Sequence, residues 1–190
     1  MKNHLNAYAR MLSEELFRLD ADEFGKMIAL LLDAYRRDAQ VFIAGNGGSA
    51  ATANHFACDF GKNAVQGGKR RFRILSVCDN IEKITALAND ISFDDVFRFQ
   101  LENLMRPEDV LIVISASGNS PDLVRACEYA KAIGGKVIAL SGFGGGRICN
   151  GADAALVTPL QSYECIEDLH SAILHMIVCW FKNHQDKLPC

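Results

Sequence analysis

The sequence lacks any apolar run that approaches the ~20 residues needed to span a bilayer, and its N-terminus is too charged for a secretory signal. It also lacks a basic surface, because 20 Lys and Arg stand against 23 Asp and Glu and the formal net charge is -3. The one dense basic run, residues 69–71 with Arg73, is interpreted as a solvated loop. We therefore expect no membrane partner and no nucleic-acid partner.

A disulfide framework is also missing from the pattern. Seven cysteines are present, an odd number, but none forms a C-x-x-C pair and several lie in apolar stretches. Scattered cysteines of this kind indicate reduced thiols and a cytoplasmic protein. No internal repeat, low-complexity tract or interior linker divides the 190 residues, so we expect a single domain.

The apolar residues first follow a helical period and then form short runs. Two amphipathic segments, 3–19 and 22–37, predict an N-terminal helical hairpin within residues 1–38. From residue 39 to 190, apolar runs alternate with helical stretches, which is typical of parallel strands buried on both faces. The expected strands are 41–44, 72–77, 110–114, 136–140 and 154–157, and the expected helices are 48–62, 80–90, 93–105, 119–133 and 163–184. The sequence therefore predicts an α/β core, a five-stranded doubly wound sheet with helices on both faces.

Two unusual loops follow the first and third predicted strands, at the sheet edge where ligands of such folds bind. Residues 45–50 read Gly-Asn-Gly-Gly-Ser-Ala, and glycines before a helix N-terminus allow close approach to an anion. The same loop also fits a dinucleotide fingerprint. Residues 115–120 read Ser-Ala-Ser-Gly-Asn-Ser before Pro121, and three hydroxyls with free helix N–H groups suit a phosphomonoester. Two such loops on one sheet favour a sugar phosphate over a dinucleotide.

Candidate acid/base groups lie on two of the predicted helices. His55 and Asp59 are four residues apart and so share one face of the helix after the glycine loop. The closing helix crowds Glu164, Glu167, Asp168, His170 and His175 into an otherwise apolar segment. A solvated first turn explains the acids, and His55 alone is compatible with a buried core histidine. Neither interpretation explains His175 among apolar neighbours.

These motifs together resemble the SIS-domain family, and within it the sedoheptulose 7-phosphate isomerases. The resemblance rests on residues 44–49 with Asn54-His55-Phe56-Ala57, on Ala88-Asn89-Asp90, and on residues 114–120, and it extends over nearly the whole chain. It implies a three-layer flavodoxin-like fold and a homotetramer with active sites at subunit interfaces. It also implies an aldose–ketose isomerase that converts sedoheptulose 7-phosphate to D-glycero-D-manno-heptopyranose 7-phosphate through an enediol, for cell-surface heptose.

The resemblance also implies roles for individual residues. The phosphate and sugar would be bound by Asn46, Gly47, Ser49, Asp90, Ser115, Ala116, Ser117, Ser120 and Glu167. The acid/base pair would be His175 with Asp59. The metal-binding members of the family imply a Zn²⁺ site made by His55, Asp59, Glu167 and His175.

Two substitutions depart from the family pattern, and other functions stay open. Asp59 replaces a longer Glu, and the anionic Glu167 replaces a Gln. Residues seven apart nearly eclipse on a helix, so His175 aligns better with Asp168 than with Glu167. The alternatives are a non-catalytic SIS adaptor that binds a partner such as a replication initiator, a pentose-phosphate isomerase and, more distantly, a dinucleotide enzyme. His175 argues against the adaptor, which has no chemical need for such a group.

Overall fold

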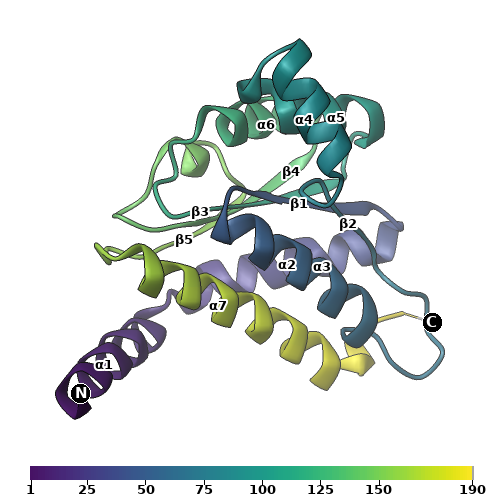
Figure 1. The fold of residues 1–190 in the computed structure, drawn as a ribbon. Coiled ribbons are helices and arrows are strands. Elements are labelled where there is room, and N and C mark those ends of the chain that lie inside the picture. Colours follow the sequence, from purple (N-terminus) through teal and green to yellow (C-terminus); the bar gives the residue numbers. More distant parts are fainter. Residues whose placement is uncertain (190) are drawn as a thin grey trace.

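A computed structural model describes residues 1–189 as a parallel sheet between two layers of helices (Figure 1). The helices are α1 (Lys2–Arg18), α2 (Ala21–Arg37), α3 (Gly48–Asn63), α4 (Ile81–Asp90), α5 (Val96–Leu104), α6 (Pro121–Ala132) and α7 (Tyr163–Asn183). The strands are β1 (Gln40–Gly45), β2 (Arg73–Ser76), β3 (Val110–Ser115), β4 (Lys136–Ser141) and β5 (Ala154–Val157). Short 3-10 turns lie at Phe93–Asp95, Arg147–Cys149 and Gln185–Lys187.

The five strands are all parallel, in the order β2-β1-β3-β4-β5. The order reverses beside β1, so β1 and β3 are neighbours although α3, β2, α4 and α5 separate them in sequence. All six residues of β3 are buried, as expected for a central strand covered on both faces. The α/β fold class predicted from the apolar runs is therefore confirmed.

Helices cover the two faces of the sheet separately. In Figure 1, α2, α3 and α7 lie below the sheet and α4, α5 and α6 above it. Each layer encloses its own buried cluster, and the lower one contains an aromatic group centred on Phe60. The ring of Phe60 lies 4.9 Å from Phe56, 4.3 Å from Phe72 and 5.4 Å from Phe181. α3 and α7 therefore lie side by side, and α3 also packs against β2.

Polar side chains end the apolar segments and start new helices. The Asp20 carboxylate accepts from the backbone N–H groups of Asp22 and Glu23, and so caps α2. The Ser162 hydroxyl accepts from Cys165 at the start of α7.

Among residues 1–189, no helix combines the length and the apolar character needed to cross a membrane.

The first helix projects from the body of the molecule, yet two side chains connect it to the rest (Figure 1). The Tyr8 hydroxyl donates to the Asp168 carboxylate on α7 at 2.6 Å. Glu15, only 5% exposed, accepts from the Thr158 hydroxyl at 2.9 Å. The expected pair of N-terminal helices is thus present, with α2 on the sheet and α1 against α7.

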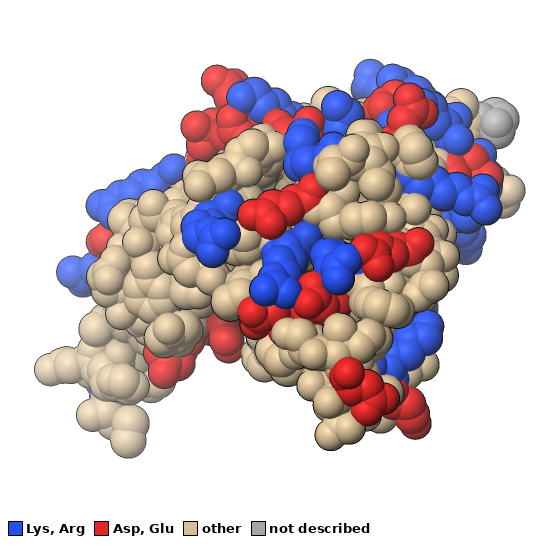
Figure 2. Space-filling model, turned by 90° about the horizontal axis from the view of Figure 1, so that it is seen from above, with Lys and Arg blue, Asp and Glu red and all other residues tan. Residues whose placement is uncertain are grey.

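The upper face shows interleaved charges of both signs. Figure 2 looks down on the layer of α4, α5 and α6, where blue and red side chains alternate among uncharged ones. Asp95 pairs with both Arg98 and Arg125, at 2.6 Å each, and Arg98 also pairs with Glu102. Basic side chains on this face therefore lie next to acidic ones.

Candidate active site

The serine turn, residues 115–120, leaves β3 and enters α6 with its shape set by hydrogen bonds. The Ser115 hydroxyl accepts from the backbone N–H of Gly118 at 3.0 Å, and the Ser117 hydroxyl accepts from Asn119 at 3.3 Å. Gly118 has φ +65°, and a Cβ there would lie 2.8 Å from the Gly146 Cα. Only glycine fits this position without strain.

The glycine turn, residues 45–48, leaves β1 and is joined to the serine turn through a buried carboxylate. The Asn46 side chain donates to Asp122 at 2.8 Å, and Asp122 is 1% exposed in the first turn of α6. Burial raises the pKa of Asp122, while the hydrogen bond from Asn46 opposes that rise. Asn46 is therefore held in one orientation between the two strand ends.

Both turns line one small pocket of about 200 Å³. Its lining residues are Asn46, Ser49, Ile114, Ser115, Ala116, Ser117, Ser120, Tyr163 and Glu167. Seven of these nine were candidate substrate residues from the sequence, while Ile114 and Tyr163 were not. Gly47 forms the adjoining turn at φ +53° and does not line the pocket. Asp90 is also absent from the lining, since it lies exposed at the end of α4 and accepts from Asn89.

A larger hollow of about 670 Å³ lies between α6 and residues 147–152. It contains the cations Lys131 and Arg147, but these already pair with Asp153 at 2.9 Å and Glu128 at 3.7 Å. Because its charges neutralise one another, the smaller pocket at the strand ends is the better candidate for an anionic ligand.

Glu167 brings a negative charge to the glycine turn. A Cβ on Gly48 would overlap its carboxylate, so the acid lies directly over the start of α3. Free N–H groups and the helix dipole favour an anion at that place. With this position taken, a phosphate dianion fits better at the serine turn than at the glycine turn.

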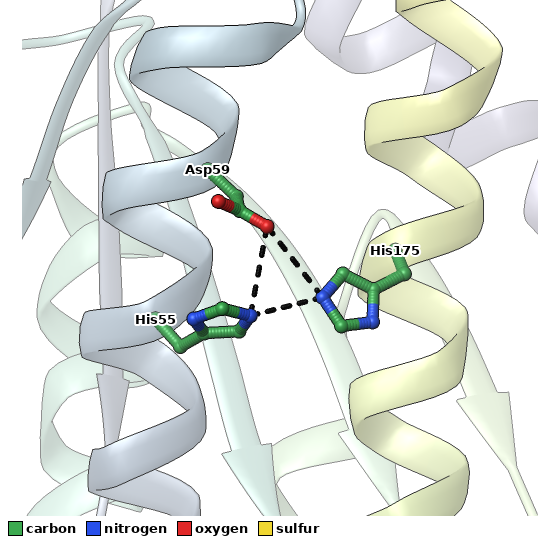
Figure 3. Close-up of side chains that lie close together, drawn as sticks. All are labelled: His55, Asp59 and His175. Carbon is green, nitrogen blue, oxygen red and sulfur yellow. Dashed lines mark hydrogen bonds and ion pairs between the residues drawn. The ribbon is translucent and has the colours of Figure 1, made fainter.

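Three of the four expected metal ligands meet farther along α3 and α7. Figure 3 shows His55 and Asp59 reaching from α3 toward His175 on α7. The Nε2 atoms of His55 and His175 are 3.0 Å apart, and each lies close to Asp59 Oδ2, at 3.5 and 3.6 Å. The two histidine side chains are about half exposed, at 55% and 48%. We call these three residues the His/Asp/His cluster.

Glu167 and Asp168 are not part of this cluster. Glu167 precedes His175 by eight residues, a rise of about 12 Å along α7, and its carboxylate lies in the pocket instead. Asp168 faces α1, where it accepts from Tyr8 and raises the pKa of that hydroxyl. The structure therefore does not bring Glu167 to the other three expected ligands, and Asp168 does not replace it.

The donor set of the His/Asp/His cluster suits one divalent metal ion. Two imidazole nitrogens and a carboxylate oxygen are typical Zn²⁺ ligands, and tetrahedral bonds of 2.0–2.1 Å place ligand atoms roughly 3.4 Å apart. The observed separations of 3.0, 3.5 and 3.6 Å bracket that value. Without an ion, only one of the facing nitrogens can donate a proton to the other. The residues fit a metal site with open positions for substrate or water.

Besides Ile114, two residues that shape the pocket, Tyr163 and Asp122, were not among the candidates from the sequence. Tyr163 precedes Glu167 by four residues, so the helical period of the closing helix places both on one face. Asp122 follows the serine loop in the first turn of its helix, and its burial cannot be deduced from that position. Helix spacing could have identified Tyr163, whereas no signal in the sequence indicated Asp122.

Comparison with known proteins connects this arrangement to a family. The SIS domain family matches residues 4–142. The phosphoheptose isomerase of Chlorobaculum tepidum is 37% identical over 175 residues, 90% of this chain and 83% of the relative. That of Helicobacter pylori strain P12 is 34% identical over 158 residues, 83% of this chain and 81% of the relative. The solved structure of the Neisseria gonorrhoeae phosphoheptose isomerase superposes with a TM-score of 0.86 at 29% identity, covering 96% of each chain.

Proposed function

The chain belongs to the SIS-domain family and, within it, to the phosphoheptose isomerases, and from this premise we propose that it is a sugar-phosphate isomerase. Its substrate would be sedoheptulose 7-phosphate and its product D-glycero-D-manno-heptopyranose 7-phosphate. The observation that carries the proposal is a hydroxyl-lined pocket at two strand ends with a His/Asp/His cluster on the helices that border it.

The serine turn is the proposed phosphate site. Ser115, Ser117 and Ser120 bring three hydroxyls to one pocket, and α6 begins directly after them. A phosphate has three terminal oxygens that need several donors, and a helix N-terminus favours its charge. Asn46 and Glu167 lie across the same pocket, where we expect them to bind sugar hydroxyls.

The His/Asp/His cluster is the proposed site of proton transfer. An aldose–ketose isomerase removes a proton from one carbon and returns it to the next, which requires a positioned base. His175 would carry the proton, with Asp59 and His55 holding its ring. Seven residues of α3 from Gly48 to His55 rise about 10 Å. An open seven-carbon chain spans roughly 7 Å, and its phosphate ester extends it further, so its length is comparable with this rise along α3.

We also propose that the His/Asp/His cluster binds Zn²⁺. The ion would supply positive charge that stabilises the oxygens of an enediol. Proton transfer and metal binding both use Nε2 of His175, so the two roles belong to different states of the site. Zinc content after dialysis provides a test separate from activity: His55→Ala should lower zinc binding strongly, and His4→Ala, on the exposed start of α1, should not. Equal zinc in both variants would refute the metal site.

A homotetramer with shared active sites is the proposed assembly. Leu5 and Phe17 on α1 are 61% and 92% exposed, and Ile81 and Phe93 near α4 are 63% and 55% exposed. Apolar groups this exposed commonly mark subunit contacts. Asp90 lies between Ile81 and Phe93 in the sequence and outside the pocket of its own chain. A neighbouring subunit would bring it to the sugar.

Mixed assemblies test this sharing of sites. Asp90→Asn and Ser117→Ala should each be nearly inactive alone. If every site takes Asp90 from one chain and Ser117 from another, random co-assembly restores about a quarter of the sites. The control is co-expression of Asp90→Asn with the double variant that carries both Asp90→Asn and Ser117→Ala, and it should restore no active sites. Failure of the first mixture to recover activity would show that sites are not shared.

Proton NMR in deuterium oxide tests the reaction itself. The purified protein with sedoheptulose 7-phosphate should give new anomeric signals and should incorporate solvent deuterium at the reacting carbon. Spectra recorded with and without added zinc show whether the reaction needs the metal. A protein that bound an initiator domain and left sugar phosphates unchanged would instead be the adaptor, which the relatives do not favour.

We further propose a cytoplasmic location, where the free thiols of Cys58 and Cys179 stay reduced.

A further inference from the structure

A third glycine-rich turn, residues 142–146, follows β4 and borders the serine turn. The Gly142 N–H donates to the Ala116 carbonyl at 2.9 Å, and the Gly144 N–H donates to Thr158 at 2.9 Å. The Gly145 N–H closes the turn on the Gly142 carbonyl at 2.8 Å. These bonds fix the turn between the serine turn and the loop that leads into α7.

The one side chain in this turn is held in an unfavourable backbone conformation. Phe143 has φ +49°, a left-handed conformation that is unfavourable for a non-glycine residue. The flanking residues are all glycine, and glycine would adopt this conformation freely. Strained residues of this kind persist where the surrounding structure requires them, often near functional sites.

The Phe143 ring packs against the only aromatic residue of the pocket. It meets the Tyr163 ring edge-on, with centroids 4.8 Å apart and planes at 70°. Tyr163 is the first residue of α7, and Glu167 follows it by one turn on the same side of the pocket. Although it is 57% exposed, Tyr163 is thus supported from behind by a residue in a fixed turn.

We propose that Tyr163 forms a subsite for the carbon chain of the sugar phosphate, with Phe143 as its positioning residue. The inference rests on the proposed function, because it names a further contact of the same substrate. Phosphate binds hydroxyls and N–H groups, whereas the C–H faces of a sugar carbon chain pack on aromatic rings. An aromatic wall next to a serine-lined phosphate site therefore selects phosphates that carry a carbon chain over inorganic phosphate.

Calorimetric titration of the full-length protein with two probes, sedoheptulose 7-phosphate and inorganic phosphate, tests the subsite. Tyr163→Ala should raise Kd for the sugar phosphate about 3- to 10-fold, in line with aromatic packing contributions. The Kd for inorganic phosphate should not change. Tyr163→Phe keeps the ring and should behave as the wild type, while Gln161→Ala, an exposed change on the same loop, is the control.

The Phe143 variants separate positioning from folding. Phe143→Asn tolerates the left-handed conformation, so the turn is kept and only the ring is lost. Phe143→Asn should raise KM for the sugar phosphate with little change in kcat. Phe143→Tyr, which keeps an aromatic ring, should have the wild-type KM. Equal binding by Tyr163→Ala and the wild type would overturn the subsite alone. A wild type that bound inorganic phosphate but no sugar phosphate would overturn the proposed function, and the subsite with it.

Discussion

Lowering the pH from 7 to 5 is expected to decrease the free energy of unfolding by about 2 kcal/mol through one imidazole, that of His170. This side chain is 1% exposed on α7, and neither ring nitrogen has a hydrogen-bond partner. Its surroundings are Leu19, Ser141, Leu156, Val157, Thr158, Leu169 and Ile173. Burial lowers the pKa of His170 to about 4, and the nearby backbone of Ser141, which forms no hydrogen bond of good geometry with the ring, opposes this only in part.

The sign follows from where the proton binds. The pKa in the folded state, about 4, is below the ordinary value of 6.5, so between these pH values the unfolded chain binds the proton and the folded chain does not. Stability therefore falls as the pH decreases from about 6.5 toward 4. A shift of this size corresponds to about 3 kcal/mol in total, of which about 2 kcal/mol is lost by pH 5.

Urea unfolding at pH 7 and pH 5, at one protein concentration, measures this effect. His170→Leu has no titrating group there and no unpaired buried nitrogen. The free energy of unfolding that this variant loses between pH 7 and pH 5 should therefore be about 2 kcal/mol smaller than the loss in the wild type. His4→Gln, on the exposed start of α1, should keep the wild-type acid response. Other groups, such as Asp122, titrate equally in all variants and cancel in the comparison. The same acid response in His170→Leu and the wild type would refute the reasoning.

Three further predictions concern the pocket, the His/Asp/His cluster and the core. His175→Ala should abolish turnover in a coupled assay but keep sugar-phosphate binding, whereas Ser117→Ala should weaken binding; full activity of the first variant would disprove its proposed role. Gly48→Ala should displace the flexible carboxylate of Glu167, raising KM without lowering the melting temperature; a large loss of stability would contradict this. Phe60→Ala, at a fully buried position, should lower the free energy of unfolding by about 3–5 kcal/mol in urea, and a loss below 1 kcal/mol would contradict its central packing.

The fold could be predicted because hydrophobic spacing directly reflects burial. The run at 110–114 differs from the observed strand Val110–Ser115 by one residue, since both faces of this strand are covered. The run at 72–77 was too long, because the edge strand Arg73–Ser76 pairs with β1 alone. The flanking residue Phe72 is buried by packing, which hydropathy cannot distinguish from pairing, whereas the Val77 N–H still donates to the Ile43 carbonyl of β1 at 3.0 Å.

The pocket was partly predictable, because parallel strands end at the same edge of a sheet. This rule alone brings the turns of residues 45–50 and 115–120 together. Glu167 was expected both in the pocket and among the metal ligands, and it lies in the pocket only, because its eight-residue separation from His175 corresponds to a rise of about 12 Å. Tyr163 was missed although it precedes Glu167 by four residues on one helix face, whereas no sequence period indicates the left-handed turn of its partner Phe143.

The two hydrogen bonds from α1 make the start of the chain relevant to the pocket. A protein shortened to begin at Ala21 would lose the Glu15 acceptor of the Thr158 hydroxyl and the Tyr8 donor to Asp168. Thr158 also accepts from the turn that carries Phe143, and Asp168 is adjacent to Glu167. Removing the projecting helix would thus take one hydrogen bond from each of two polar side chains beside the ligand-binding loops, and would perturb affinity even where subunit assembly was preserved.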